Sequence, residues 1–192
     1  MSKNMLLQRN SCKSGIWLLQ KIKDHSICSS FDCGDDDLND YFHNESIPHK
    51  EQLIAQSYCL QSSTQLGVPV ALLDFCNDSI SFKDYRSFIT NADVKKYPSL
   101  PAVKLTRFGV NQPFQQHGVG THLLNMVKAL FMTDNRTGCR WITVDAYSHV
   151  VGFYEKNGFE LMTDKDKDNK IRAMAFDLKR FSPPPNFKFD IG

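Results

Sequence analysis

The order of apolar and polar positions in the first half of the chain predicts strands separated by irregular segments. An early strand is expected from Trp17 to Ile22. Two further strand-like runs, at 56–61 and 68–75, are joined by a polar connection that includes Gly67, which is typical of a hairpin. The stretch 77–100 mixes charged and aromatic residues, and we expect it to be irregular with a helical turn or two.

An acidic segment marks the start of the first predicted helix. Gly34 and three aspartates precede apolar residues at helical spacing, namely Leu38, Tyr41 and Phe42. Negative side chains there favour the positive end of the helix dipole. We therefore expect these aspartates to cap a helix rather than to bind a metal ion.

The pattern of apolar and polar positions in the second half of the chain predicts alternating strands and helices. A β-rich run at 102–110 leads into a helical segment at 111–131, whose apolar residues recur every three or four positions: Val119, Leu123, Val127 and Leu130. A further strand at 141–147 is followed by a short helix at about 148–157. This order of elements predicts an α/β layer in which neighbouring strands run parallel.

The end of the last helix carries a turn signal. Gly158 suits the left-handed position after the helix, and Phe159 can then fold back onto the last turn.

The composition indicates one ordinary globular domain. Of 192 residues, 41% are hydrophobic and 23% charged, which excludes a disordered or fibrous chain. The formal net charge of +2 is far below the excess of a dedicated nucleic-acid binder. The six cysteines form no C-x-x-C pair, the N-terminus lacks a signal-peptide pattern, and no apolar run approaches about 20 residues. We expect a soluble, cytoplasmic protein with reduced thiols and no membrane association.

The most informative stretch lies where the strand at 102–110 meets the following helix. Its members are Gln115, Gln116, His117, Gly118, Val119, Gly120 and Thr121. A helix start exposes unpaired backbone N–H groups and the positive end of the dipole, and glycines let a phosphate approach the backbone. The stretch suits a pyrophosphate, and a tight turn alone would equally explain its glycines.

Other phosphate-binding loops do not fit this stretch. A P-loop requires G-x-x-x-x-G-K-S/T, and a dinucleotide fingerprint requires G-x-G-x-x-G, where this sequence has Leu123 in place of the third glycine. The spacing of Gln115, Gly118 and Gly120 instead resembles the Q/R-x-x-G-x-G/A acyl-CoA loop of the GNAT superfamily of N-acetyltransferases.

Both flanks of the loop support this resemblance. The segment LTRFGVNQPFQQHGVGTHLL looks like the family's fourth strand and following helix, and GFYEKNGFE resembles its last helix and turn, so the resemblance spans roughly 102–160. It implies a single-domain, GNAT-like α/β fold with a mixed central sheet and helices on both faces. The implied domain covers 1–182, and the proline-containing segment 183–192 is expected to be a tail.

The resemblance also implies roles for individual residues. In the family, the strand before the loop hydrogen-bonds the pantetheine arm through its backbone, which falls here on Phe108, Gly109 and Val110. The amides of residues 116–121 would hold the pyrophosphate. Tyr154 takes the position of the tyrosine that protonates the departing thiolate. The implied co-substrate is acetyl-CoA, and no metal is expected.

Tyr154 also suits the role of acid by its own chemistry. A phenol with an ordinary pKa near 10 stays protonated at neutral pH and can give a proton. Its other reading is a core aromatic residue beside Phe153. Tyr147 departs from the family pattern, since many members have an asparagine there that helps to hold the CoA arm; Tyr147 would stack or line the acceptor side instead.

The sequence favours an acceptor amine of low pKa. No acidic residue occurs between Lys104 and Val110, where several relatives of the family carry a glutamate that deprotonates the acceptor. A lysine amine with a pKa near 10.4 needs such a base, whereas an α-amine near 7.7 to 8.0 is already partly neutral. Asp145 could act through water, or it could cap the next turn.

Two segments resemble one branch of the family. FDCGDDDLNDYF and LPAVKLTRFGV look like the GNAT toxins of bacterial toxin–antitoxin modules, which acetylate the α-amine of aminoacyl-tRNA. We expect an N-acetyltransferase that moves an acetyl group from acetyl-CoA to a primary amine by direct attack. The alternative function is that of a GNAT toxin with tRNA and an antitoxin as partners. For the assembly, a homodimer is considered beside a single chain.

The basic residues give mixed support to a tRNA partner. The charges at 164–172 alternate in sign and are typical of a solvated hairpin. Before position 26 the only acidic residue is Asp24, and there are five basic residues: Lys3, Arg9, Lys13, Lys21 and Lys23. Folding could gather these basic residues with Lys95 and Lys96 into a phosphate-binding patch.

The sequence gives less support to function classes other than acyl transfer. A non-catalytic acyl-CoA-binding module would keep the loop, and Tyr154 argues mildly against it. A zinc site is disfavoured because its candidates match no compact ligand pattern: Cys28, Cys33, His43 and His49. Serine hydrolysis has no G-x-S-x-G motif to support it.

Overall fold

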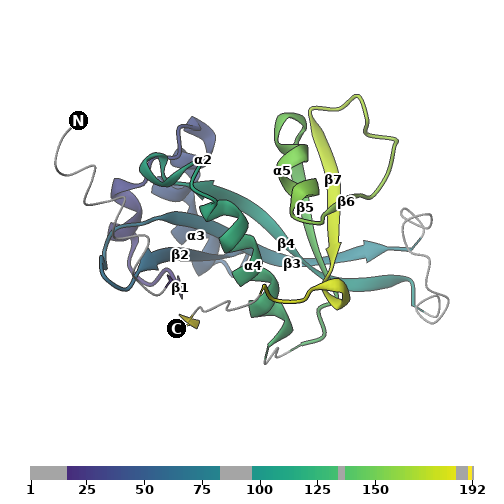
Figure 1. The fold of residues 1–192 in the computed structure, drawn as a ribbon, viewed down its shortest axis with the longest axis horizontal. Helices are drawn as coiled ribbons and strands as arrows, with labels where there is room; N and C mark the ends of the chain where they lie inside the picture. The colour runs from purple at the N-terminus through teal and green to yellow at the C-terminus, as the bar shows by residue number, and fades with distance from the viewer. Residues whose placement is uncertain (1–16, 83–96, 134–136, 185–189, 192) are drawn as a thin grey trace. The chain divides into compact units, whose positions relative to one another are not determined.

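The computed structural model describes residues 17–82, 97–133, 137–184 and 190–191 (Figure 1). Its strands are β1 (Trp17–Lys21), β2 (Gln56–Ser62), β3 (Ala71–Ser81), β4 (Ser99–Val110), β5 (Trp141–Tyr147), β6 (Glu160–Leu161), β7 (Ile171–Asp177) and β8 (Asp190–Ile191). Its α-helices are α2 (Asp36–Asp40), α3 (Ser46–Glu51), α4 (Val119–Met132) and α5 (Val151–Lys156), and short 3-10 segments include Gln112–Phe114 and Leu178–Arg180. None of these helices is both long and apolar enough to cross a membrane.

The strands among these residues are hydrogen-bonded in the order β6-β7-β5-β4-β3-β2-β1-β8. Some neighbours are antiparallel, as in β1 with β2, and others are parallel, as in β4 with β5. The α/β fold with a mixed sheet, predicted from the sequence, is therefore confirmed.

The chain groups into two compact units. The described residues of the first unit are 17–74, 107–126, 183–184 and 190–191, and those of the second are 75–82, 97–106, 127–133 and 137–182. Each unit has its own apolar core.

The first unit is built around the antiparallel pair of β1 and β2 and the segment that follows β1. Leu19 of β1 faces Leu60 of β2, and both side chains are fully buried. Phe31 and Phe42 pack edge to face with their ring centroids 5.4 Å apart, in a buried cluster that includes Leu72. Two residues of the predicted tail, Asp190 and Ile191, pair in parallel with β1 as strand β8.

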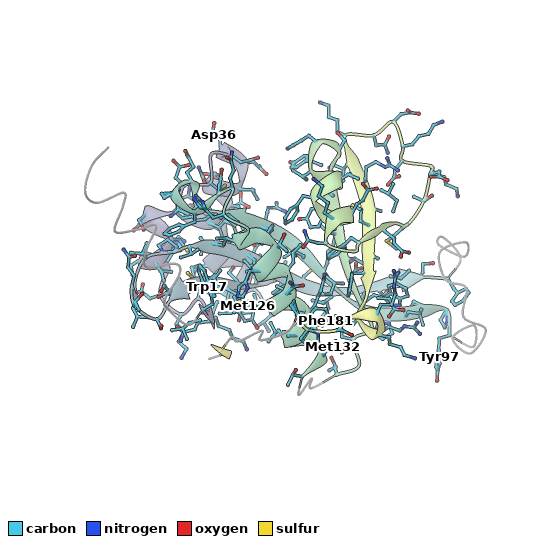
Figure 2. All side chains as sticks on the ribbon, in the orientation of Figure 1. Trp17, Asp36, Tyr97, Met126, Met132 and Phe181 are labelled. Atoms are coloured by element: carbon cyan, nitrogen blue, oxygen red, sulfur yellow. The ribbon has the colours of Figure 1, made fainter. Side chains whose placement is uncertain are left out.

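The acidic segment caps a helix, as predicted. The Asp35 carboxylate accepts a hydrogen bond from the Leu38 N–H at 3.0 Å, at the start of α2, and Asp36 and Asp37 occupy its first turn. Asp36 is exposed, and its position is labelled in Figure 2. Among the described residues, no group of three or more His, Cys, Asp or Glu side chains could hold a metal ion.

The second unit contains the predicted parallel strand pair. Val103 of β4 faces Ile142 of β5 in a parallel register, and β5 pairs antiparallel with β7. Strand β3 extends to Ser81, whereas the sequence predicted an irregular stretch from residue 77. The extension places Ile80 in the core, where it is fully buried, and lets Asp78 accept a 2.5 Å hydrogen bond from the Thr143 hydroxyl.

Helix α4 begins later than the sequence pattern suggested. A 3-10 turn spans Gln112–Phe114, and α4 starts at Val119, so 115–118 form a loop rather than a helical turn. The reason is local, because Gln116 and Gly118 have positive φ angles of 61° and 75°, which a right-handed helix does not admit.

Candidate functional site

The loop at 115–118 turns sharply directly before α4. Positive φ at Gln116 and Gly118 turns the chain twice within three residues, and a residue other than glycine rarely adopts this conformation. A Cβ atom added to Gly118 would meet no other atom within 4 Å, so the backbone here faces open space. This open backbone is what a phosphate group needs in order to approach.

Gln115 fixes the loop to the rest of the first unit. Its side-chain Nε2 donates to the Val110 carbonyl at 2.8 Å and to the Cys33 carbonyl at 2.7 Å. Gln112 adds a second tie, because its Nε2 donates to the Asp32 carboxylate at 2.8 Å and its N–H to the Asp32 carbonyl at the same distance. The motif glutamine therefore has a structural role that positions the loop.

The first amides of α4 follow this loop directly. The His122 N–H donates to the Gly118 carbonyl at 3.0 Å and closes the first helical turn. The amides of Val119, Gly120 and Thr121 precede that bond, and first-turn amides have no partner within their own helix. Together with the dipole of a helix of 14 residues, they form a positive surface that can hold a pyrophosphate.

The end of β4 lies in the same unit. A Cβ atom at Gly109 would stand 2.8 Å from the Phe31 ring and 3.2 Å from the Cys33 sulfur. Glycine is therefore required here by the close passage of the 31–33 segment. Phe108 and Val110, the other two predicted residues of this strand end, are half-buried.

Asn111 is a supporting residue that the sequence reasoning missed. It is buried, its Nδ2 donates to the Pro69 carbonyl at 2.9 Å, and its N–H donates to the Val70 carbonyl at 3.0 Å. Its side-chain oxygen also accepts from the Asp32 N–H at 3.3 Å. An asparagine directly after a strand end was the available signal, since asparagine often bonds nearby backbone at such positions.

Tyr154 lies in the second unit, on α5. Its side chain is buried, with 6% of its surface exposed, and its ring packs edge to face against Phe153 and Phe159. Burial raises the pKa of the Tyr154 phenol above its ordinary value. The phenol therefore stays protonated throughout the neutral range.

The predicted turn after α5 is confirmed. Gly158 has a φ of 81°, its N–H donates to the Glu155 carbonyl at 2.9 Å, and the Phe159 N–H donates to the Tyr154 carbonyl at 3.0 Å. These two bonds form a Schellman motif. The ring of Phe159 lies 5.4 Å from that of Tyr154, so it folds back onto the last turn as expected.

Two residues considered for the acceptor side are also in the second unit. The Asp145 carboxylate forms an ion pair with Lys104 at 2.5 Å. Burial opposes the charge of Lys104, but the hydrogen bond and charge of Asp145 outweigh it and raise the pKa of Lys104. Tyr147 is 43% exposed and stacks on His149, with ring centroids 5.7 Å apart.

The zinc reading finds no support in the first unit. Cys28 is buried, which raises the pKa of its thiol to about 11. His43 Nε2 bonds to the Phe31 carbonyl at 2.9 Å, and His49 Nδ1 bonds to the Tyr41 hydroxyl at 3.3 Å. The candidate ligands therefore serve separate structural contacts.

Some of the basic residues considered for tRNA binding lie within the described residues, and others do not. Lys21 and Lys23 are exposed and line a cavity of about 620 Å³ beside β1. The run at 164–172 covers part of the connection between β6 and β7 and the first two residues of β7, and Arg172 of β7 pairs with Asp166 of the connection at 2.8 Å. The other residues of the proposed phosphate patch lie outside the described residues: Lys3, Arg9, Lys13, Lys95 and Lys96.

Comparison with known proteins identifies similar chains. A family model described as acetyltransferase (GNAT) domain matches residues 82–180, just over half of the chain. A search of curated proteins found no match.

Solved structures share the fold at low identity. A mutant of KacT is 19% identical with a TM-score of 0.70, over 85% of this chain and 96% of that one. AtaTR bound with AcCoA is 18% identical with a TM-score of 0.67, over 85% and 94%. AtaT complexed with acetyl-methionyl-tRNAfMet is 20% identical with a TM-score of 0.66, over 85% and 95%.

Proposed function

The chain belongs to the GNAT acetyltransferase family, and from this premise we propose which of its residues carry out acetyl transfer. It is an acyl-CoA-dependent N-acetyltransferase that uses acetyl-CoA as co-substrate. The amides of residues 116–121 hold the pyrophosphate, Gln115 fixes their loop, the backbone of Phe108, Gly109 and Val110 bonds the pantetheine arm, and Tyr154 is the proton donor.

The proposed reaction is a direct transfer. The lone pair of a neutral amine attacks the acetyl carbonyl carbon, and a backbone N–H at the end of β4 polarises the carbonyl oxygen. The new C–N bond forms as the C–S bond breaks. The Tyr154 hydroxyl protonates the departing thiolate and regains a proton from solvent, and the amine loses its extra proton to solvent. No covalent enzyme intermediate is required.

One observation carries this assignment more than any other. The positive φ angles of Gln116 and Gly118 open the backbone directly before α4, while the Gln115 side chain holds the loop in place with two bonds to carbonyl oxygens. A glycine needed only for a tight turn would not require the two hydrogen bonds by which Gln115 holds the loop. The combination supports a preformed site for the diphosphate of acetyl-CoA.

The acceptor is proposed to be an amine of low pKa. The stretch from Lys104 to Val110 contains no acidic side chain, and the nearby Asp145 is engaged by Lys104. An α-amine is partly neutral at pH 7 and can react without a dedicated base, whereas a lysine amine is not.

We further propose the α-amine of aminoacyl-tRNA as the acceptor, with an antitoxin as a protein partner. The support is the shared fold with AtaT, whose solved complexes contain acetyl-methionyl-tRNAfMet in one case and the C-terminus of the antitoxin AtaR in another.

The test is release of free CoA thiol from acetyl-CoA in the presence of an amine panel. The panel contains an aminoacyl-tRNA, the same tRNA without its amino acid, a free α-amine peptide and an N-terminally blocked lysine peptide. We expect turnover with α-amines and little with the lysine side chain. Turnover that requires the aminoacyl-tRNA supports the toxin reaction, whereas acetyl-CoA binding without turnover on any amine would support a non-catalytic module.

A further inference from the structure

Lys128 of α4 is a buried cation in the second unit. Only 4% of its surface is exposed, and its Nζ donates to the Asn157 carbonyl at 2.6 Å. No carboxylate among the described residues lies within ion-pair distance of this ammonium. A charge buried in this way is costly unless other groups stabilise it.

Three aromatic rings surround this ammonium. Nζ lies 4.0 Å from the ring centroid of Phe176 and 5.7 Å from those of Phe159 and Phe181. A ring face attracts a cation within about 6 Å of its centroid, and more strongly when water is excluded. Phe181 follows the short helix after β7 (Figure 2), so the rings come from separate segments of the unit.

The carbonyl that accepts from Lys128 belongs to the last turn of the helix that carries Tyr154. The Asn157 N–H donates to the Tyr154 carbonyl at 3.0 Å, and its side-chain Nδ2 donates to the Phe153 carbonyl at 2.8 Å. Phe159, which contributes a ring to the cation, also packs against the Tyr154 ring. Lys128 therefore bonds the turn at 157–159. This turn donates hydrogen bonds to the Tyr154 carbonyl and packs the Phe159 ring against the Tyr154 ring.

An apolar side chain would fill this space without a buried charge. Replacing buried charges by apolar residues of similar size is often neutral or stabilising. A lysine here consequently does something that packing alone does not explain: it gives the end of a helix of only six residues a directed bond from a different element.

We propose that Lys128 is the positioning residue for Tyr154, the proton donor of the proposed function on which this inference rests. Its ammonium fixes the Asn157 carbonyl and thereby the last turn of α5. The Phe159 ring, which lies near the ammonium and also packs against the Tyr154 ring, fixes the orientation of the phenol. Lys128 does not contact the reacting atoms in this role.

The test compares Lys128→Met with Lys156→Met. Methionine keeps the length of the buried side chain and removes the donor and the charge, and Lys156 is an exposed lysine in the last turn of α5. We expect Lys128→Met to lower kcat about tenfold and to leave KM for acetyl-CoA within about twofold. Lys156→Met should change neither.

Amide hydrogen exchange gives a readout that is independent of activity. Exchange at Asn157, Gly158 and Phe159 should become about tenfold faster in Lys128→Met and stay unchanged in Lys156→Met. Lys128→Arg, which retains a cation and a donor, should restore part of both kcat and protection. Unchanged kcat and unchanged exchange in a folded Lys128→Met protein would overturn the proposal.

A double-variant cycle separates this inference from the proposed function. If Lys128 acts through Tyr154, adding Lys128→Met to Tyr154→Phe costs little further activity. An additive loss would overturn the positioning role. Full activity of Tyr154→Phe would instead overturn the acid role of Tyr154, whatever the exchange of the α5 turn shows.

Discussion

The side-chain amide of Gln115 donates to the carbonyl of Val110 at 2.8 Å, which joins the first residue of the loop to the last residue of β4. The same amide group bonds the Cys33 carbonyl. Gln115→Ala removes both bonds and lets the loop leave its binding conformation. We expect the Kd for acetyl-CoA to rise about tenfold, which corresponds to about 1.4 kcal/mol.

Isothermal calorimetry checks this value, with Gln116→Ala as the matched control. Gln116 lies in the same loop, but its side chain is exposed. An equal loss of affinity in both variants would contradict the fastening role of Gln115.

Gly118→Val should weaken acetyl-CoA binding by tenfold or more. A β-branched residue at a φ of 75° is strained by about 1–2 kcal/mol, and its side chain blocks the open backbone. Gly67→Val is the control, because Gly67 has a φ of 83° and equally open surroundings but lies between β2 and β3. Both variants should lose similar stability in urea unfolding, and only Gly118→Val should lose affinity in calorimetry.

Tyr154→Phe should lower turnover by about 10²-fold or more with little change in acetyl-CoA affinity. The substitution removes the proton donor and keeps the buried ring that packs against Phe159. Thiol release measures the rate, and Tyr97→Phe, at an exposed position before β4, serves as the control. Wild-type turnover in Tyr154→Phe would exclude the phenol as the acid.

Gly109→Ala should destabilise the first unit by about 1–3 kcal/mol, because its Cβ would stand 2.8 Å from the Phe31 ring. Phe31→Leu removes the atom that would clash. We therefore expect the double variant to lose less free energy of unfolding than the sum of the two single variants. Strict additivity in urea unfolding would show that Phe31 is not the residue that demands glycine.

The pH dependence of stability should reveal the buried charge of Lys128. Burial lowers the pKa of Lys128 from 10.5 to about 8 in the folded protein, whereas an unfolded lysine keeps a pKa near 10.4. Between these values the unfolded chain binds a proton that the folded chain does not. The free energy of unfolding of the wild type should therefore rise from pH 8 to 10.5, relative to Lys128→Met.

Urea unfolding of both proteins at several pH values checks this difference, which should approach about 1.4 kcal/mol per pH unit at most. Below pH 8 the difference should be constant, since Lys128 is then protonated in both states. Parallel curves from pH 7 to 10.5 would contradict a lowered pKa.

Local sequence signals predicted the elements whose cause is local. Strand β5 was expected at 141–147 and is found at Trp141–Tyr147, and Gly158 was expected to end the last helix. Glycine at a positive φ and a run of β-branched and aromatic residues act within a few positions, so they can be read from the chain alone.

The supporting contacts of the site could not be predicted in this way. Gln115 bonds a carbonyl 82 positions earlier in the chain, at Cys33, and Gly109 is required by the distant Phe31 ring. The rings around Lys128 come from three later positions in the chain, Phe159, Phe176 and Phe181. In the sequence, Lys128 is indistinguishable from an ordinary solvent-facing lysine of a helix. Such contacts depend on the tertiary fold, which periodicity does not specify.

Lys104 pairs with Asp145, and no residue from Lys104 to Val110 is acidic. In the proposed reaction, the supply of neutral amine is set by the equilibrium of the acceptor with water rather than by a side chain of the enzyme. Acidification of the medium would slow the proposed acetylation by protonating the acceptor amine. In this respect the substrate, and not the protein, would sense pH.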